Sequence, residues 1–147
     1  MLTKTLRTLA VLTTVALTTT AAQAAVPTPR AIDASRFELV NSELNVCLEW
    51  NGDHDVAVYG CSSSPGQRWY SPDHVTIRSS VTGACLASAD YEEVVLADCD
   101  GSRSQKWNEE RQGLVNDGDG HCLTVERGWV IMARCGATSG QTWDFVQ

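Results

Sequence analysis

A motif of cysteine, five residues and Gln-x-Trp occurs three times in this chain of 147 residues. Its cysteine and tryptophan positions are Cys61 and Trp69, Cys99 and Trp107, and Cys135 and Trp143. Successive tryptophans are 38 and 36 residues apart, a period typical of proteins built from repeated supersecondary units. We therefore expect three equivalent units, in which each position can be compared with its two counterparts.

The pattern within the units predicts β-structure. The units comprise residues 37–71, 75–110 and 113–147, inside one expected domain over 36–147. Apolar residues recur at two-residue spacing in short runs, as at Val56 and Val58, and turn-forming stretches such as residues 64–66 separate the runs. No segment has a helical stripe of useful length. We predict an all-β fold with about four short strands per unit and about twelve in total.

Cysteine spacing indicates one disulfide per unit. The chain has six cysteines, and the gaps from 47 to 61, from 85 to 99 and from 122 to 135 are 14, 14 and 13 residues. Six cysteines permit many pairings, but the repeat favours Cys47–Cys61, Cys85–Cys99 and Cys122–Cys135. A zinc site needs tighter Cys or His spacing, which is absent, so we expect neither a metal nor a cofactor.

The first residues have the form of a targeting segment. Lys4 and Arg7 precede a largely apolar run over residues 9–17, and Ala22-Gln23-Ala24 resembles a cleavage site. The run is shorter than the roughly 20 residues of a membrane-spanning helix. We predict a signal peptide over 1–24, a flexible proline-containing leader over 25–35, and a secreted protein whose disulfides form outside the cell.

The charge of the chain excludes some partners. Its net charge is −7, and removal of the signal peptide would make it more negative by taking away Lys4 and Arg7. Nucleic acids and anionic membranes both attract basic surfaces, so we expect neither as a partner. The acidity itself is consistent with solubility.

The thrice-repeated combination of Cys-Leu, Val-x-(Val/Leu/Met)-x-x-Cys and Gln-x-Trp resembles the ricin-B-type lectins. The resemblance covers residues 37–147 and implies a β-trefoil, a six-stranded barrel closed by three hairpins with pseudo-threefold symmetry. It also implies up to one shallow sugar site per repeat, usually for galactose-type or xylan-type saccharides. Three large rings are expected in the structural core, those of Trp69, Trp107 and Trp143.

The first repeat retains part of the family's sugar site. In the family, an acid lies two residues after the first cysteine, and an aromatic residue lies two before the second. Glu49 and Tyr59 occupy these positions. The two family amide positions, four before the second cysteine and just before the Gln of Gln-x-Trp, hold Ala57 and Gly66 instead. A sugar needs hydroxyl acceptors and an aromatic face, so the first repeat is a candidate site from which both family amides are missing.

Other first-repeat residues are candidates to complete this site. Asp53 and His54, in the loop between the paired cysteines, could supply replacement hydroxyl partners. Gln67 is the one Gln-x-Trp glutamine that we consider for ligand contact. Strand alternation turns Tyr59 outward if Val58 points inward, and it places Trp50 in the core.

The second and third repeats are predicted to bind no sugar. The acid and aromatic positions read Ala87 and Ala97 in the second repeat, and Thr124 and Ala133 in the third. Trp129 lies in the short loop of the third repeat, where it is either a lone aromatic platform or a plug for the loop.

The expected function is that of a secreted, non-catalytic carbohydrate-binding protein with at most one family-type site. No Ser-His-Asp order, His-Glu-x-x-His motif or acid pair indicates catalysis. The alternative is a sugar-silent trefoil that binds proteins or inhibits a hydrolase, for which outward-facing Val95 and Ile131 could form an apolar patch. The residues distinguish neither among sugars nor among oligomeric states.

Overall fold

The computed structural model describes residues 32, 35–90, 92–111 and 113–147. The predicted signal peptide over 1–24 lies outside these residues, as does most of the predicted leader. No helix in the described part of the chain is long and apolar enough to cross a membrane.

The described residues form twelve strands, four in each repeat, as the sequence pattern predicted. The first repeat contains β1 (Arg36–Asn41), β2 (Val46–Trp50), β3 (Val56–Tyr59) and β4 (Trp69–Tyr70). The second contains β5 (Arg78–Ser79), β6 (Cys85–Ser88), β7 (Val94–Ala97) and β8 (Trp107–Glu110). The third contains β9 (Gly113–Asn116), β10 (Cys122–Glu126), β11 (Trp129–Ala133) and β12 (Trp143–Val146). A short 3-10 turn precedes each last strand: η1 (Pro65–Gln67), η2 (Arg103–Gln105) and η3 (Ser139–Gln141).

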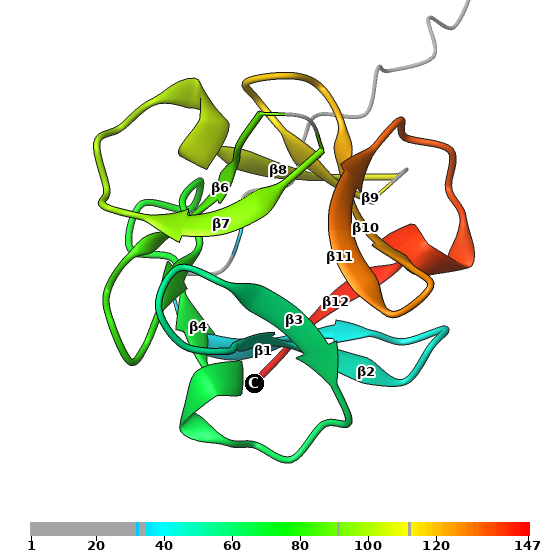
Figure 1. Cartoon of the computed structure of the whole chain (residues 1–147), viewed down its shortest axis with the longest axis horizontal. Helices are drawn as coiled ribbons and strands as arrows, with labels where there is room; N and C mark the ends of the chain where they lie inside the picture. The colour runs from blue at the N-terminus through cyan, green and yellow to red at the C-terminus, as the bar shows by residue number, and fades with distance from the viewer. Residues whose placement is uncertain (1–31, 33–34, 91, 112) are drawn as a thin grey trace, which may run out of the picture.

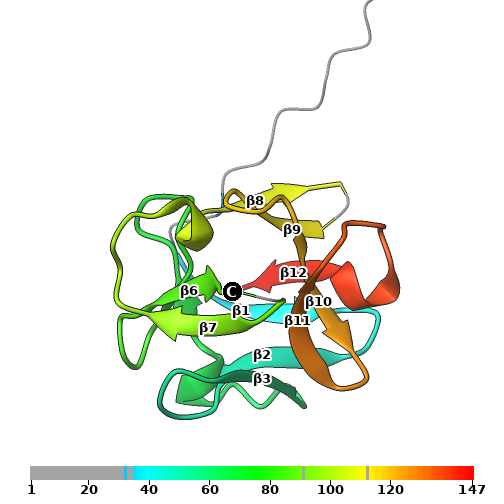
Figure 2. The ribbon, with the colours of Figure 1, turned by 45° about the horizontal axis from the view of Figure 1, so that its top comes forward.

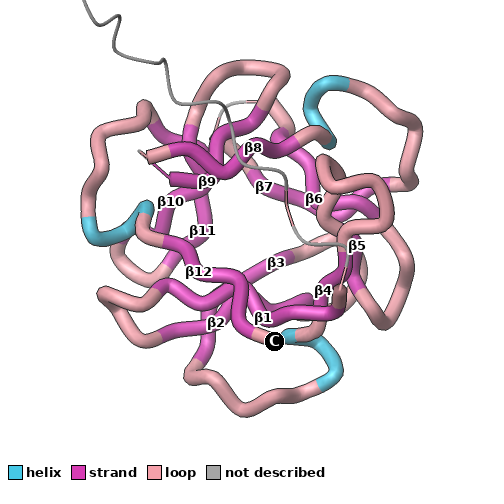
Figure 3. The backbone as a smooth tube through the Cα atoms, turned by 180° about the vertical axis from the view of Figure 1, so that it is seen from behind, coloured by secondary structure: helices cyan, strands magenta, loops and turns pink. Residues whose placement is uncertain are grey.

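Six of the described strands form three hairpins, and the other six lie on the opposite side of the molecule. Strands β2–β3, β6–β7 and β10–β11 pair as antiparallel hairpins, and Figure 1 looks onto them as three lobes around a centre. The other strands lie behind them, as Figure 3 shows from the opposite side. Strand β1 pairs with β12, which joins the two ends of the described fold (Figure 2). The rings of Phe37 and Phe145 meet edge to face across this pair, with centroids 4.9 Å apart. The arrangement is the predicted β-trefoil.

The three Gln-x-Trp tryptophans are buried in equivalent ways. Trp69, Trp107 and Trp143 are 0%, 0% and 6% exposed. Each indole Nε1 donates a hydrogen bond to the carbonyl of the leucine that follows the first cysteine of its repeat. These acceptors are Leu48 at 3.0 Å, Leu86 at 2.9 Å and Leu123 at 2.8 Å. The indoles thus fill the core and satisfy one buried carbonyl in each repeat.

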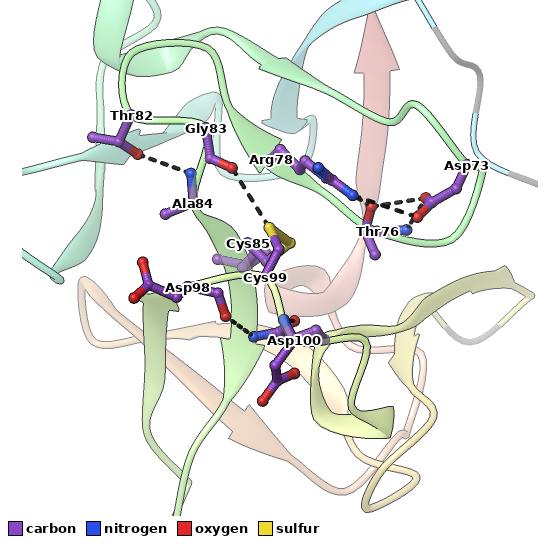
Figure 4. The surroundings of a disulfide bond; sticks show 12 residues. Asp73, Thr76, Arg78, Thr82, Gly83, Ala84, Cys85, Asp98, Cys99 and Asp100 are labelled. Atoms are coloured by element: carbon purple, nitrogen blue, oxygen red, sulfur yellow. Dashed lines mark hydrogen bonds and ion pairs between the residues drawn. A yellow bond between two sulfur atoms is a disulfide. The ribbon is translucent and has the colours of Figure 1, made fainter.

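One disulfide lies in each repeat, as predicted: Cys47–Cys61, Cys85–Cys99 and Cys122–Cys135. Each ties the beginning of the hairpin's first strand to the chain just after its second strand. Figure 4 shows the second bridge, where the Gly83 carbonyl lies 3.5 Å from Cys99 Sγ.

The packed structure extends into the predicted leader. Ile32 is 1% exposed and belongs to the hydrophobic core. Its backbone N–H donates to the carbonyl of His74 at 3.1 Å, and its carbonyl lies 2.7 Å from His74 Nδ1. Residue 32 is therefore anchored, although it precedes the expected domain boundary at 36.

Candidate functional site

The β2–β3 hairpin brings Glu49 and Tyr59 onto one face. Cys47 lies opposite Tyr59 and Glu49 lies opposite Ala57, so the two candidate residues are diagonal neighbours across the strand pair. Such neighbours are within reach of each other when their side chains are long or aromatic. Leu48, on the alternate face, is fully buried, whereas Tyr59 is 47% exposed and Glu49 is half-buried. The acid and the aromatic ring therefore share the outer face.

The buried side chain of Gln67 holds the carboxylate of Glu49 by a hydrogen bond. Its Nε2 donates to Glu49 Oε2 at 2.7 Å and to the Gly60 carbonyl at 3.0 Å. Its Oε1 accepts from Ser62, at 2.8 Å from the backbone nitrogen and 3.3 Å from the hydroxyl. Gln67 is 0% exposed and uses both polar atoms, so the structure places it under the surface as a positioning residue, away from direct ligand contact.

One oxygen of Glu49 remains available. Among the described residues, none donates a hydrogen bond to Glu49 Oε1, whereas Oε2 is held by Gln67. A carboxylate oxygen that is fixed in place and still has free lone pairs can accept a hydrogen bond from a hydroxyl without prior rearrangement.

Gly66 provides the room that Glu49 occupies. A Cβ at position 66 would lie 3.0 Å from the Trp50 carbonyl oxygen, 3.1 Å from Glu49 Cγ and 3.4 Å from Glu49 Oε1. These separations are at or below normal contact distances. A side chain at position 66 would therefore crowd both the Trp50 backbone and the Glu49 side chain.

Asn51 brings an amide to the site that the sequence analysis missed. The hydroxyl of Tyr59 donates to Asn51 Oδ1 at 3.2 Å. The family's own amide positions are occupied here by Ala57 and Gly66. Asn51 follows Glu49 by two residues, so strand alternation alone would have placed both on one face.

The two loop candidates have different surroundings. Asp53 is exposed in the turn after β2, with φ of 47°, and its carbonyl accepts from Trp50 Nε1 at 3.0 Å. His54 instead contacts the second repeat: its Nδ1 lies 2.9 Å from the Leu96 carbonyl, and its own carbonyl accepts from the Leu96 N–H at 2.8 Å. His54 thus ties the hairpin to β7, while Asp53 stays open to solvent.

The other repeats have no carboxylate at the position of Glu49. In the second repeat, Ala87 is buried there. In the third, Thr124 is 6% exposed, accepts from Gln141 Nε2 at 3.0 Å and donates to the Cys122 carbonyl at 2.8 Å. In the third repeat the Thr124 hydroxyl takes the place of the Glu49 carboxylate as the hydrogen-bond partner of the glutamine, and both of its hydrogen bonds are made within the protein.

The remaining tryptophans also differ in exposure. Trp50 is half-buried and packs against the core. Trp129, the first residue of β11, is 75% exposed, so it does not plug its loop. Val95 and Ile131, the proposed apolar patch, are both half-buried.

A family model agrees with this geometry. The model described as the ricin-type beta-trefoil lectin domain matches residues 35–145. A search of curated proteins by sequence finds no match.

Solved structures of lectins share the fold. A non-toxic homologue of type II RIPs from Momordica charantia, in complex with alpha-methyl-D-galactoside, is 21% identical with a TM-score of 0.69, over 77% of this chain and 48% of that one. The hemolytic lectin CEL-III is 21% identical with a TM-score of 0.70, over 81% and 31% of the two chains. The Vibrio vulnificus hemolysin/cytolysin β-trefoil lectin, with N-acetyl-D-lactosamine bound, is 20% identical with a TM-score of 0.66, over 76% and 93%. The chain thus spans less than half the length of the first two structures.

Proposed function

Because this chain belongs to the ricin-type beta-trefoil lectin domain family, we propose that it is a secreted, non-catalytic carbohydrate-binding protein. Its single family-type sugar site would lie on the outer face of the β2–β3 hairpin. The observation that carries this proposal is the carboxylate of Glu49, held by Gln67 with one oxygen open, on the same face as the exposed ring of Tyr59.

Each group at this face matches one part of a pyranose. The Tyr59 ring offers an apolar surface for the C–H face of the sugar. Glu49 Oε1 can accept from a ring hydroxyl, and the amide nitrogen of Asn51 can donate to a second hydroxyl. Asp53, exposed at the hairpin turn, is within the same loop and is the remaining acceptor candidate. Such a site selects a sugar by its hydroxyl pattern and needs no catalytic group.

Galactose-type saccharides are the first ligands to test. The Momordica structure holds alpha-methyl-D-galactoside, and the Vibrio lectin holds N-acetyl-D-lactosamine, which contains galactose. Xylan-type saccharides are the second class that the family resemblance implies. A single shallow polar site gains little net free energy, so we expect weak binding, with dissociation constants of about a millimolar.

The decisive measurement is an NMR titration with methyl galactoside, N-acetyllactosamine and xylo-oligosaccharides. We expect resonances of the β2–β3 hairpin to shift, and we expect Glu49→Gln and Tyr59→Ala each to weaken binding by about tenfold. Glu110→Gln makes the same charge change at the exposed last residue of β8 and serves as the matched control. No binding of any of these sugars, or equal binding by all variants, would sink the proposal.

Secretion is tested separately. The basic start, the apolar run and Ala22-Gln23-Ala24 support export with cleavage before Ala25. When the full chain is expressed in its source organism, the protein should be recovered from the culture medium, and its N-terminal sequence should begin at or near residue 25. An intact N-terminus on cell-retained protein would contradict export.

A further inference from the structure

The three hairpins meet around a hollow that borders the Glu49–Tyr59 face, because Asn51 and Ala57 are among its lining residues. Strands β3, β7 and β11 contact one another, and they face the viewer around the centre of Figure 1. The hollow has a volume of about 250 Å³ and takes lining residues from all three repeats. Six of them occupy two equivalent positions per repeat: Val56, Val94 and Val130, and Asp55, Glu93 and Trp129.

The inner side of this hollow follows the threefold repeat, whereas its rim does not. The three valines occupy one repeat position, and all of them pack against the core. The residue just before each valine is exposed, and it is Asp55, Glu93 or Trp129. The hollow therefore has an apolar inner side and a rim of two carboxylates and one indole.

The rim side chains have no evident role in holding the fold. Trp129 is 75% exposed, although it is among the largest apolar side chains in the chain. No hydrogen bond or ion pair joins the carboxylate of Asp55 or Glu93 to any residue that the structure describes. Exposed aromatic surface beside unpaired charges is a feature of binding sites more than of stable scaffolds.

The surrounding turns make this end of the molecule acidic. The turns over residues 51–55, 89–93 and 126–129 contain one lysine or arginine, Arg127, whose Nε lies 4.0 Å from Glu126 Oε1. Their acids are Asp53, Asp55, Asp90, Glu92, Glu93 and Glu126. Asp55 and Glu93 line the hollow itself, and the other four lie in the turns of the same hairpins. Several like charges at one end of a molecule produce a local negative potential that attracts cations and repels anions.

We propose that this hollow binds a lysine or arginine side chain of a basic protein segment. The alkyl stem of either side chain can lie on the valines while its cationic end stays at the rim. There the cation would meet the carboxylates of Asp55 and Glu93 and the face of the Trp129 indole, the aromatic ring that attracts cations most strongly. A neutral saccharide would use the indole but would leave the two carboxylates without opposite charge.

The test uses the full chain without its signal peptide and a short acetylated, amidated peptide of alternating lysine and glycine. The same peptide with acetylated lysine side chains is the neutral control. We expect the lysine peptide to shift the indole N–H resonance of Trp129 and its acetylated form to leave it unchanged. Binding should weaken severalfold from 0.05 M to 0.5 M salt, because salt screens the exposed carboxylates.

Variants separate a specific site from general charge attraction. We expect Trp129→Ala to weaken binding about fivefold, and Asp55→Asn with Glu93→Gln to weaken it about tenfold. Glu110→Gln removes one charge from β8, behind the hairpins in Figure 1, and should leave binding unchanged. Glu49→Gln should also leave it unchanged, which makes failure here distinguishable from failure of the carbohydrate proposal. Thermal unfolding of each variant checks that the exposed substitutions keep the fold.

Four results would overturn the proposal. In the first the lysine peptide fails to bind, and in the second its acetylated form binds equally well. In the third, Glu110→Gln loses as much peptide affinity as the variants of the hollow. In the fourth, a neutral saccharide displaces the peptide and shifts the indole N–H resonance of Trp129. The last result would assign the hollow to carbohydrate.

Discussion

Gln67 donates a hydrogen bond of 2.7 Å to Glu49, so the side chain that secures the end of the first repeat also positions the candidate site's acid. The equivalent glutamines bond to carbonyls in the same manner, Gln105 to Asp98 at 2.8 Å and Gln141 to Arg134 at 3.0 Å. Neither has a carboxylate partner at the position of Glu49. Among the three repeats, scaffold and candidate site are coupled in this way only in the first.

Replacing the two buried glutamines separates these roles. Gln67→Ala and Gln105→Ala should each lower the free energy of unfolding by about 1–3 kcal/mol, because each leaves buried backbone groups unpaired. Only Gln67→Ala should also weaken sugar binding, since it releases the Glu49 carboxylate. Urea unfolding and the NMR titration measure the two effects. Full sugar affinity in Gln67→Ala would show that Glu49 needs no positioning.

The close packing of Glu49 and Gly66 predicts strong coupling between them. Gly66→Asn adds a Cβ that would lie 3.0 Å from the Trp50 carbonyl oxygen and 3.1 Å from Glu49 Cγ, so it should destabilise the fold by about 1–3 kcal/mol. Combining it with Glu49→Ala removes Cγ and Oε1 and should recover part of this loss, while the contact with the Trp50 carbonyl oxygen remains. A double-mutant cycle in urea measures the coupling, and additive effects would contradict it.

The same change should destabilise the fold strongly at a buried tryptophan and hardly at all at an exposed one. Trp107→Phe removes the indole donor to the Leu86 carbonyl and part of a fully buried ring, so we expect a loss of about 2–4 kcal/mol. Trp129→Phe changes an exposed ring and should stay within about 0.5 kcal/mol. Denaturant midpoints measure both. A large loss in Trp129→Phe would give that ring a structural role.

Asp73 predicts a contribution to stability that depends on pH. Partial burial alone would raise its pKa. The opposing effects prevail, namely hydrogen bonds from Thr76 and Val75 and the charge of Arg78, so the pKa of Asp73 is lowered (Figure 4). The unfolded chain then binds more protons in acid, and this stabilisation is present above the unfolded pKa of about 3.9 and is lost as pH falls through the folded pKa.

The matching experiment compares Asp73→Asn with the wild type from pH 7 to pH 2. We expect the variant to be less stable at neutral pH by about 0.5 kcal/mol, a small value because the carboxylate is well exposed to solvent. The difference should vanish in acid. Exposed Asp144→Asn is the control, and a difference that stays constant with pH would refute the assigned cause.

Features that repeat along the chain were predictable from sequence. The Cys and Gln-x-Trp spacing led to twelve strands, one disulfide per repeat and the trefoil, because every repeat must place the same groups in the same core. Period-two alternation predicted an exposed Tyr59 beside Val58, which packs against the core. These constraints act between residues close in sequence or recur at a fixed spacing, so the sequence pattern alone predicts them.

Features that depend on contacts between distant residues needed the tertiary structure. It showed that Gln67 is consumed within the fold, that Gly66 makes room for Glu49, and that Asn51 completes the face with Tyr59. It also brought Asp55, Glu93 and Trp129 to one hollow.

The sequence by itself determined that three copies of one unit build this protein. Only the tertiary structure decided what the differences between the copies do. The physical reason is that core packing demands the same residues in each repeat, while the exposed positions are free to differ. What those positions can bind depends on which of them the fold places side by side.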